Sequence, residues 1–157
     1  MSDTAVSVHD YFDDATFARI KAFADTHETP FLVVDTATID RQYDDLRRYF
    51  PTARIYYAVK ANPAPQVLTL LKDKGASFDI ASIYELEKVL ALGVSPDRVS
   101  FGNTIKKAKD IRAFYQKGVR MFATDSEADL RNIAKAAPGA RIYARILTEG
   151  TLTADWP

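Results

Sequence analysis

Strand-like segments recur at a fixed spacing along most of this chain. They can be placed at Ile55, Ser77, Val99, Met121 and Tyr143, each 22 residues after the one before, with helix-like segments between them. Regular alternation of strand and helix is typical of a parallel sheet whose strands are joined by crossover helices. The repeat therefore predicts an α/β fold with about five βα units.

Glycine and hydroxyl residues mark the ends of the predicted helices. A glycine falls just past each of four helices, where a left-handed cap conformation favours this residue: Gly75, Gly93, Gly118 and Gly139. Two helix starts have the spacing of a capping box, with Ser82 before Glu85 and Thr124 before Glu127. These two glutamates therefore need no catalytic role.

The repeat leaves more than one architecture open. A leucine-rich solenoid is disfavoured, because the Leu-x-x-Leu-x-Leu pattern does not recur. Right-handed βα units can open into a doubly wound sheet or close into an eight-stranded barrel, and local patterning does not separate the two. A closed barrel needs eight units and no helix is predicted after the fifth strand, so we expect the chain to be cut short rather than complete.

The chain before the repeat has a different pattern. Aromatic and aliphatic side chains recur at helix-like spacing over residues 11–23 and predict an amphipathic helix, followed by a turn at residues 27–30. Residues 31–34, with the sequence FLVV, predict a strand. Residues 36–50 predict a further helix with an apolar stripe on one side.

Lys60 has the most unusual position in the repeat. It follows the uncharged, β-branched and aromatic run at residues 55–59, which predicts a buried strand, and it precedes Asn62 and Pro63, which stop that strand. A lysine at a strand end is most often a solvated charge. At the carboxyl end of a core strand, where α/β folds place their chemistry, desolvation would instead lower the pKa of the amine. We therefore expect Lys60 to be a nucleophile suited to Schiff-base formation.

Charge and composition disfavour several classes of function. Lys plus Arg and Asp plus Glu both number 21, so the chain lacks the basic field that nucleic acid or an anionic membrane would need. It has no cysteine and only two histidines, His9 and His27, so we expect neither disulfides nor a metal site. The polar first residues indicate neither a signal peptide nor a membrane span, and we expect a cytoplasmic protein.

Several short motifs occur together and in order along the repeat. They are YAVKANP at residues 57–63, FDIAS at 78–82, FGNTIK at 101–106, TDSE at 124–127 and ARI at 144–146. From about residue 30 onward the chain resembles the ornithine/lysine/diaminopimelate decarboxylase family, whose members are pyridoxal-phosphate enzymes with an alanine-racemase-like barrel. The Ala-Asn-Pro after Lys60 and the tail ADWP at 154–157 are most similar to bacterial ornithine or ornithine/lysine decarboxylases.

This resemblance implies roles for four residues. Lys60 would be the catalytic residue, holding pyridoxal 5'-phosphate as a Schiff base at the end of the first barrel strand. Asp79 would lie near this lysine and hold a cation in position, unless it caps the following helix. Arg145, placed inside the fifth strand, would reach inward to polar groups around the cofactor ring or form a structural ion pair. Ala58 would face the cofactor on the same side as Lys60, unless it is small only for barrel packing.

Other polar residues at the strand ends have ordinary explanations. Helix starts and solvated charge account for Asn103, Lys106 and Asp125. No clustered glycines are present to bind a cofactor phosphate, since Gly102 and Gly150 are isolated. The phosphate-binding loop and the substrate-binding residues are therefore expected outside this chain.

The resemblance also implies the organisation and activity of the complete protein. Residues 1–34 would form an N-terminal helix and strand that belong with a carboxyl-terminal β domain, and residues 35–157 would be part of a pyridoxal-phosphate-binding TIM (β/α)8 barrel. A homodimer would decarboxylate a basic amino acid, L-ornithine to putrescine or L-lysine to cadaverine or both, in polyamine biosynthesis. The alternatives are a diaminopimelate decarboxylase and a non-catalytic relative, such as an antizyme inhibitor or a cofactor carrier. The 157-residue chain alone should be inactive, because Lys60 would lack phosphate and ring contacts.

Overall fold

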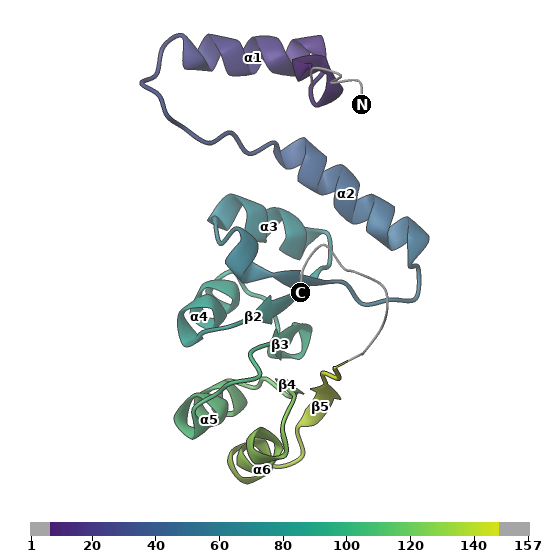
Figure 1. Ribbon diagram of the computed structural model, residues 1–157, viewed down its shortest axis with the longest axis vertical. Helices are drawn as coiled ribbons and strands as arrows, with labels where there is room; N and C mark the ends of the chain where they lie inside the picture. The colour runs from purple at the N-terminus through teal and green to yellow at the C-terminus, as the bar shows by residue number, and fades with distance from the viewer. Residues whose placement is uncertain (1–6, 148–157) are drawn as a thin grey trace. The chain divides into compact units, whose positions relative to one another are not determined.

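The computed structural model describes residues 7–147 (Figure 1). Gly150 and the segments 1–4 and 154–157, which entered the sequence analysis, lie outside the described residues. The chain divides into two compact units, with the boundary between Asp35 and Thr36. The unit before this boundary is helical, and the unit after it contains the sheet.

The first unit contains a short 3-10 helix, η1 (Val8–Asp10), and one α-helix, α1 (Asp14–Ala24), in the region where the aromatic spacing predicts a helix. α1 begins where the Asp13 carboxylate accepts a hydrogen bond from the Thr16 amide at 2.7 Å. The strand predicted over residues 31–34 does not form. An extended segment becomes a strand only by pairing its backbone groups, and no strand of the described chain pairs with this one.

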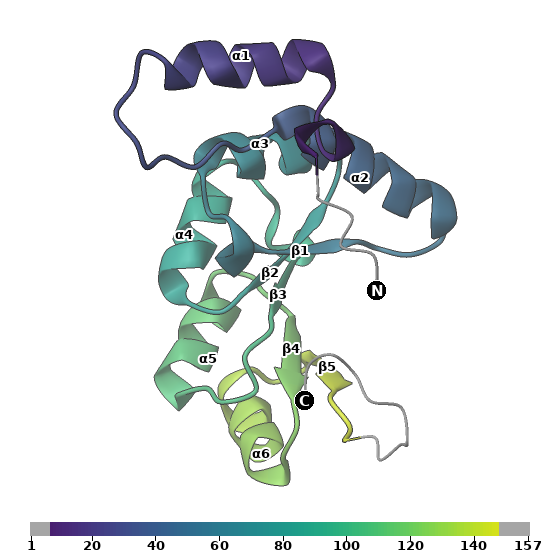
Figure 2. The same cartoon turned by 45° about the horizontal axis from the view of Figure 1, so that its top comes forward.

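The second unit alternates helices and strands, as the repeat predicts. In chain order it comprises α2 (Thr36–Tyr49), β1 (Tyr56–Ala58), η2 (Val59–Ala61), α3 (Pro65–Asp73), β2 (Ser77–Ile80), α4 (Ile83–Ala91), η3 (Pro96–Arg98), β3 (Val99–Phe101), α5 (Ala108–Gln116), β4 (Met121–Thr124), α6 (Glu127–Ala136) and β5 (Arg141–Ala144). Helices α3, α4, α5 and α6 follow one another along the same side of the sheet (Figure 1 and Figure 2).

All five strands are parallel and lie in the order β1-β2-β3-β4-β5. Paired residues are 21 positions apart from β1 to β4, as in Tyr56 beside Ser77, and 20 positions apart in the last pair, where Met121 lies beside Arg141. The first four predicted strand positions are correct to within one residue, whereas β5 begins two residues before Tyr143. The reason is that both connections of the last unit are short, with two residues from β4 to α6 and four from α6 to β5, whereas each earlier unit has one connection of six or seven residues.

The core lies between the sheet and helices α3 to α6. Phe78 of β2 and Phe122 of β4 are completely buried, and the ring of Phe101 on β3 stacks on Phe114 of α5 with 3.8 Å between the ring centroids. Burying one such side chain stabilises the fold by about 1.5–3 kcal/mol. This aromatic layer therefore fixes the helices against one face of the sheet and leaves the strand ends to define the site.

The predicted helix ends are largely confirmed. All four glycines that follow helices have a positive φ, between 76° and 94°: Gly75, Gly93, Gly118 and Gly139. At the start of α4, Ser82 Oγ accepts a hydrogen bond from the Glu85 amide at 3.3 Å. The Glu85 carboxylate accepts one from the Ala81 amide at 2.6 Å, so this glutamate has the structural role that the capping spacing predicts.

The capping box predicted for Thr124 and Glu127 is wrong. Thr124 is the last residue of β4, and Ser126 is the N-cap of α6, whose side chain accepts a hydrogen bond from the Asp129 amide at 3.4 Å. The cap lies two residues later than predicted because the extended conformation of β4 continues through Thr124. As a result Asp129 lies on the buried face of α6, four residues before Ile133.

Two features are absent from the described residues. No helix within residues 7–147 combines the length and the apolar character needed to cross a membrane. The same residues contain no group of three or more histidine, aspartate or glutamate side chains placed to hold a metal ion.

Candidate active site

A pocket of about 300 Å³ lies at the carboxyl ends of β1, β2, β3 and β5. The four residues that the family resemblance singles out, Ala58, Lys60, Asp79 and Arg145, all line this pocket, although they come from three different strands or strand ends. Residues 102–105, in the loop after β3, complete its wall. Parallel strands end at one edge of a sheet, which is why positions far apart in the sequence meet here.

Lys60 lies on η2, two residues after the end of β1. Its neighbour Val59 is completely buried and anchors this turn in the core, whereas Lys60 itself is exposed. No hydrogen bond or ion pair of the Lys60 amine is found among residues 7–147. The expectation that the described fold desolvates this lysine is therefore wrong, because the lysine sits on a turn at the pocket rim rather than within the strand.

The turn that carries Lys60 is held by polar contacts on both sides. The Tyr57 hydroxyl donates to the carbonyl oxygen of Asn62 at 3.2 Å, and Asn62 Oδ1 accepts from the Ala64 amide at 3.0 Å. Burial raises the pKa of the Tyr57 phenol, so it remains a hydrogen-bond donor at neutral pH. The backbone around Lys60 is thus fixed while its amine stays free.

Asp79 projects from β2, and its Oδ1 accepts hydrogen bonds from Ser100 Oγ at 2.5 Å and from the Tyr143 hydroxyl at 3.2 Å. It does not cap α4, because Ser82 occupies that position. Burial, and after it the negative charge of Asp79, raises the pKa of the Tyr143 phenol. The two hydroxyl donors therefore hold a carboxylate at the pocket edge.

Gly102 has a role that its isolation in the sequence hides. A Cβ atom added at this position would collide with the Asp79 carboxylate. Any residue with a Cβ atom here would have to displace the Asp79 carboxylate from its hydrogen bonds to Ser100 and Tyr143. Gly102 has no glycine neighbour in the sequence, and only the meeting of β2 with the loop after β3 shows why a glycine lies here.

Arg145 differs from its prediction in position and in partner. It follows β5 rather than lying inside it, and its side chain forms no ion pair with a carboxylate among residues 7–147. Instead Arg145 Nη2 donates to the carbonyl oxygen of Gly102 at 3.0 Å. Ala58, the last residue of β1, pairs in register with Asp79. The small side chain of Ala58 leaves the space between Lys60 and Asp79 open.

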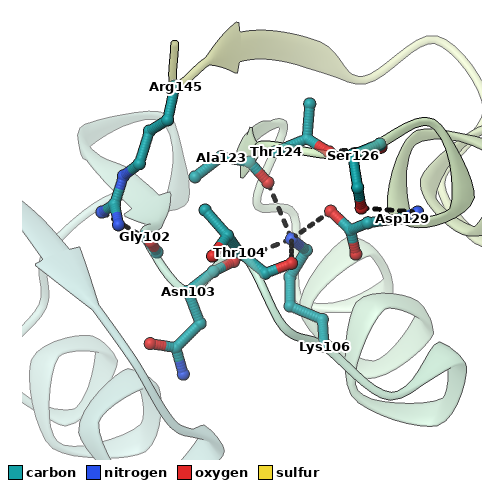
Figure 3. Close-up of polar contacts among 9 residues, drawn as sticks. All are labelled: Gly102, Asn103, Thr104, Lys106, Ala123, Thr124, Ser126, Asp129 and Arg145. Carbon is teal, nitrogen blue, oxygen red and sulfur yellow. Dashed lines mark hydrogen bonds and ion pairs between the residues drawn. The ribbon is translucent and has the colours of Figure 1, made fainter. Parts of the chain in front are cut away.

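Lys106 corrects the sequence analysis most clearly, because it is not a solvated charge. Its side chain is completely buried and its amine lies 2.6 Å from Asp129 Oδ2. Figure 3 shows the amine of Lys106 pointing toward the Asp129 carboxylate. Asn103 and Asp125 are exposed, as a solvated position predicts, although Asn103 Nδ2 donates to the Ala81 carbonyl oxygen at 2.7 Å. The sequence contains a signal for this pair, because Asp129 lies on the apolar face of its helix and a carboxylate there needs a cationic partner.

Comparison with known proteins identifies relatives of this chain. The sequence model of the family described as pyridoxal-dependent decarboxylase, pyridoxal binding domain, matches residues 36–155. The lysine/ornithine decarboxylase of Selenomonas ruminantium is 38% identical over 128 residues, which cover 82% of this chain and 33% of the relative. The antizyme inhibitor 2 of Xenopus laevis is 34% identical over 119 residues, which cover 76% of this chain and 26% of the relative. The chain thus spans about a third or less of the length of these curated relatives.

Solved structures share the fold. The lysine/ornithine decarboxylase of Vibrio vulnificus, solved with putrescine, has a TM-score of 0.78 at 29% identity over 85% of this chain and 37% of that one. The protein SrLDC, solved with pyridoxal phosphate and cadaverine, has a TM-score of 0.77 at 34% identity over 96% of this chain and 37% of that one. The five-stranded parallel sheet is therefore the amino-terminal part of a pyridoxal-phosphate-binding (β/α)8 barrel. Together, the family match over most of the chain and this shared fold show that the chain belongs to the pyridoxal-dependent decarboxylase family.

Proposed function

We propose that these residues supply the lysine-bearing part of an amino-acid decarboxylase that uses pyridoxal 5'-phosphate. The observation that carries the proposal is the pairing, in one pocket, of an exposed Lys60 amine without a partner in the described chain and the fixed carboxylate of Asp79. A free amine is the group that bonds an aldehyde. A carboxylate beside it favours and orients the cationic form of a nitrogen.

The residues present fit this cofactor. The pocket volume of about 300 Å³ lies at the lower end of the range for small-molecule sites, about 300–1,000 Å³. The absence of a side chain on Gly102 lets the loop wall approach Asp79, and the small residue Ala58 lines the pocket with Lys60. In this proposal Lys60 binds the cofactor aldehyde and Asp79 holds the cationic nitrogen beside it. Arg145 fixes the loop wall through the Gly102 carbonyl group.

Bound pyridoxal phosphate supplies an electron sink for the electron pair left on the substrate when carbon dioxide departs. The chain contributes binding and orientation. Lys60 would hold the cofactor through its amine, and the same amine would be placed to carry a proton to or from an amino-acid substrate in the pocket. Asp79 lines the same pocket as Lys60, and Ser100 and Tyr143 keep its carboxylate in place.

We propose L-ornithine or L-lysine as the substrate, with putrescine or cadaverine as the product, in polyamine biosynthesis. Support comes from the relative in Selenomonas ruminantium, which is named for both substrates, and from the Vibrio vulnificus structure solved with putrescine. Residues 1–34 are proposed to belong with a carboxyl-terminal β domain of a cytoplasmic homodimer. The division of the chain near Asp35, and a match that covers only 33% of the relative in Selenomonas ruminantium, support the assignment of residues 1–34 to a separate domain.

The test measures carbon dioxide released from carboxyl-labelled L-ornithine, L-lysine and diaminopimelate by the full-length protein. The proposal expects release from ornithine or lysine that depends on added pyridoxal phosphate. Release from diaminopimelate alone would contradict the substrate assignment. Carbon dioxide release that stays the same after pyridoxal phosphate has been removed from the protein and left out of the assay would contradict the mechanism.

A second candidate function is that of a non-catalytic regulator. The observation in its favour is the 34% identity to an antizyme inhibitor, since a relative with this name retains similarity over 76% of the chain. The same assay separates the two candidates. Full-length protein that binds pyridoxal phosphate but releases no carbon dioxide from any of the three amino acids would favour the regulator.

A further inference from the structure

Lys106 is buried although the proposed chemistry does not use it. None of its side chain is exposed, and its Nζ lies 2.6 Å from Asp129 Oδ2 and 2.7 Å from the carbonyl oxygens of Asn103 and Ala123. The Thr104 carbonyl oxygen is a fourth acceptor at 3.4 Å. An ammonium group has three N–H donors, so all of them are engaged. This amine has no donor left for a ligand.

The partners of Lys106 belong to three different elements. Asn103 and Thr104 lie in the loop of residues 102–107 that contains Lys106 itself, whereas Ala123 lies in β4 and Asp129 in α6 (Figure 3). The side chain therefore closes its own loop and ties that loop to the next βα unit. Because residues 102–105 of this loop line the candidate pocket, the contacts of Lys106 lie directly behind the pocket wall.

The other contacts of the loop are more exposed. Arg145 bonds the Gly102 carbonyl oxygen, and Asn103 bonds the Ala81 carbonyl oxygen, but the side chains of Arg145 and Asn103 both belong to exposed residues. Exposed polar contacts compete with water, whereas a buried ion pair cannot open without leaving a charge in the core. The buried pair is therefore the contact that confines the loop to one conformation.

We propose that the Lys106–Asp129 pair positions residues 102–105 as the wall of the cofactor pocket, so that Lys106 is a positioning residue and not a second reactive lysine. The identity of the ligand rests on the proposed function. The positioning of the loop does not, because it follows from the contacts of the chain alone. The pair thus links the order of the pocket wall to the packing of α6 behind it.

The experiment removes both charges together from the full-length protein, as Lys106→Met with Asp129→Leu. Replacing one partner alone leaves an unpaired buried charge, whereas replacing both by apolar residues is often tolerated. The matched control is Lys74→Met with Asp40→Leu, which removes a lysine–aspartate pair at 2.7 Å that does not line the pocket. Amide hydrogen exchange is measured over residues 102–105 in the cofactor-free protein, and the Kd for pyridoxal phosphate is measured by titration.

The expected result is a local change in a protein that stays folded. Exchange over residues 102–105 should become faster by about tenfold or more, with a thermal transition close to that of the wild type. The Kd for pyridoxal phosphate should rise by about tenfold or more, while the control pair changes neither quantity. Unchanged exchange in this segment overturns the proposal. Faster exchange spread evenly over the protein also overturns it, because a merely stabilising pair would act in that way.

A second variant keeps the test decisive if the apolar pair does not fold. Lys106→Gln with Asp129→Asn removes both charges but keeps polar atoms at both positions, and it is judged by the same two measurements. Wild-type protein that fails to bind pyridoxal phosphate would contradict the proposed function, whereas the exchange measurement would still decide whether the pair positions the loop. Faster local exchange with an unchanged Kd would refute the link between the loop and cofactor binding.

Discussion

Two lysines at the carboxyl edge of the sheet have opposite surroundings. Lys60 lies two residues after the end of β1, and it is exposed with no partner for its amine among residues 7–147. Lys106 lies five residues after the end of β3, and its buried amine contacts a carboxylate and three backbone carbonyl oxygens. Both follow strands that end at the same edge of the sheet, so their sequence positions alone do not distinguish them.

The contrast separates two uses of one side chain. An amine must be free to attack a carbonyl group, whereas an amine whose N–H groups are all engaged can only hold structure in place. The pocket uses both, since Lys60 faces it and Lys106 lies behind its loop wall. Reactivity at this edge is therefore decided by partners and burial rather than by the position of a lysine in the βα repeat.

Removing Lys60 has the largest expected effect and tests the reactive half of the comparison. In the full-length protein, Lys60→Ala should lower decarboxylase activity by about 10³-fold or more, because the group that binds and orients the cofactor is gone. Its free energy of unfolding should change by less than about 0.5 kcal/mol, because the side chain is exposed. Steady-state kinetics measures the activity, and urea unfolding measures the free energy of unfolding. An activity within about tenfold of the wild type would contradict the assignment.

Removing Lys106 alone tests the structural half. Lys106→Met should lower the free energy of unfolding by about 3–5 kcal/mol, because the Asp129 carboxylate is left buried without its cation. The control is the exposed neighbour Lys107, for which Lys107→Met should change the same quantity by less than about 0.5 kcal/mol. Urea unfolding of both variants provides the comparison. Equal stabilities would show that the buried pair does not hold the loop.

A methyl group at Gly102 disturbs the pocket wall without changing either lysine. Gly102→Ala should lower the free energy of unfolding by about 1–3 kcal/mol, because its Cβ collides with the Asp79 carboxylate. Adding Asp79→Ala should recover part of this loss, with a coupling energy of at least about 1 kcal/mol in a double-mutant cycle. Strictly additive effects of the two substitutions would mean that the collision does not determine the cost.

The periodic features of this chain could be predicted from the sequence because they depend on local patterns. Four of the five strand positions are correct to within one residue, and the four glycines past helix ends have the expected backbone conformation. The meeting of Lys60, Asp79 and Arg145 could also be predicted, because parallel strands end at the same edge.

Other features depend on contacts between distant segments, which the local strand and helix patterns do not show. Lys106 is buried because Asp129, in the following βα unit, faces it. When the start of α6 is predicted two residues too early, Asp129 is not assigned to the buried face of that helix. Gly102 matters only because Asp79 approaches it from β2. Residues 31–34 have strand-forming side chains but no described strand to pair with, so their local preference is not realised.

The smallest expected effect concerns the pH response of Tyr143, beside Asp79. Burial and the charge of Asp79 raise the pKa of this phenol in the folded protein above its usual value near 10. The unfolded chain therefore ionises first, so the contribution of Tyr143 to stability is fully present below about pH 10 and is lost as the pH rises above it. The difference in unfolding free energy between the wild type and Tyr143→Phe should be flat below this pH and decrease above it. A difference that increases there would contradict the sign of the shift.

The central claim is that Lys60, and not Lys106, carries the cofactor. The most direct measurement is borohydride reduction of the full-length protein with pyridoxal phosphate bound, followed by peptide mapping of the labelled lysine. Reduction makes the bond between the lysine amine and the cofactor aldehyde permanent, so the label records which amine was bonded. The label should appear on Lys60. A label on Lys106, or on any other lysine with Lys60 unmodified, would contradict the account.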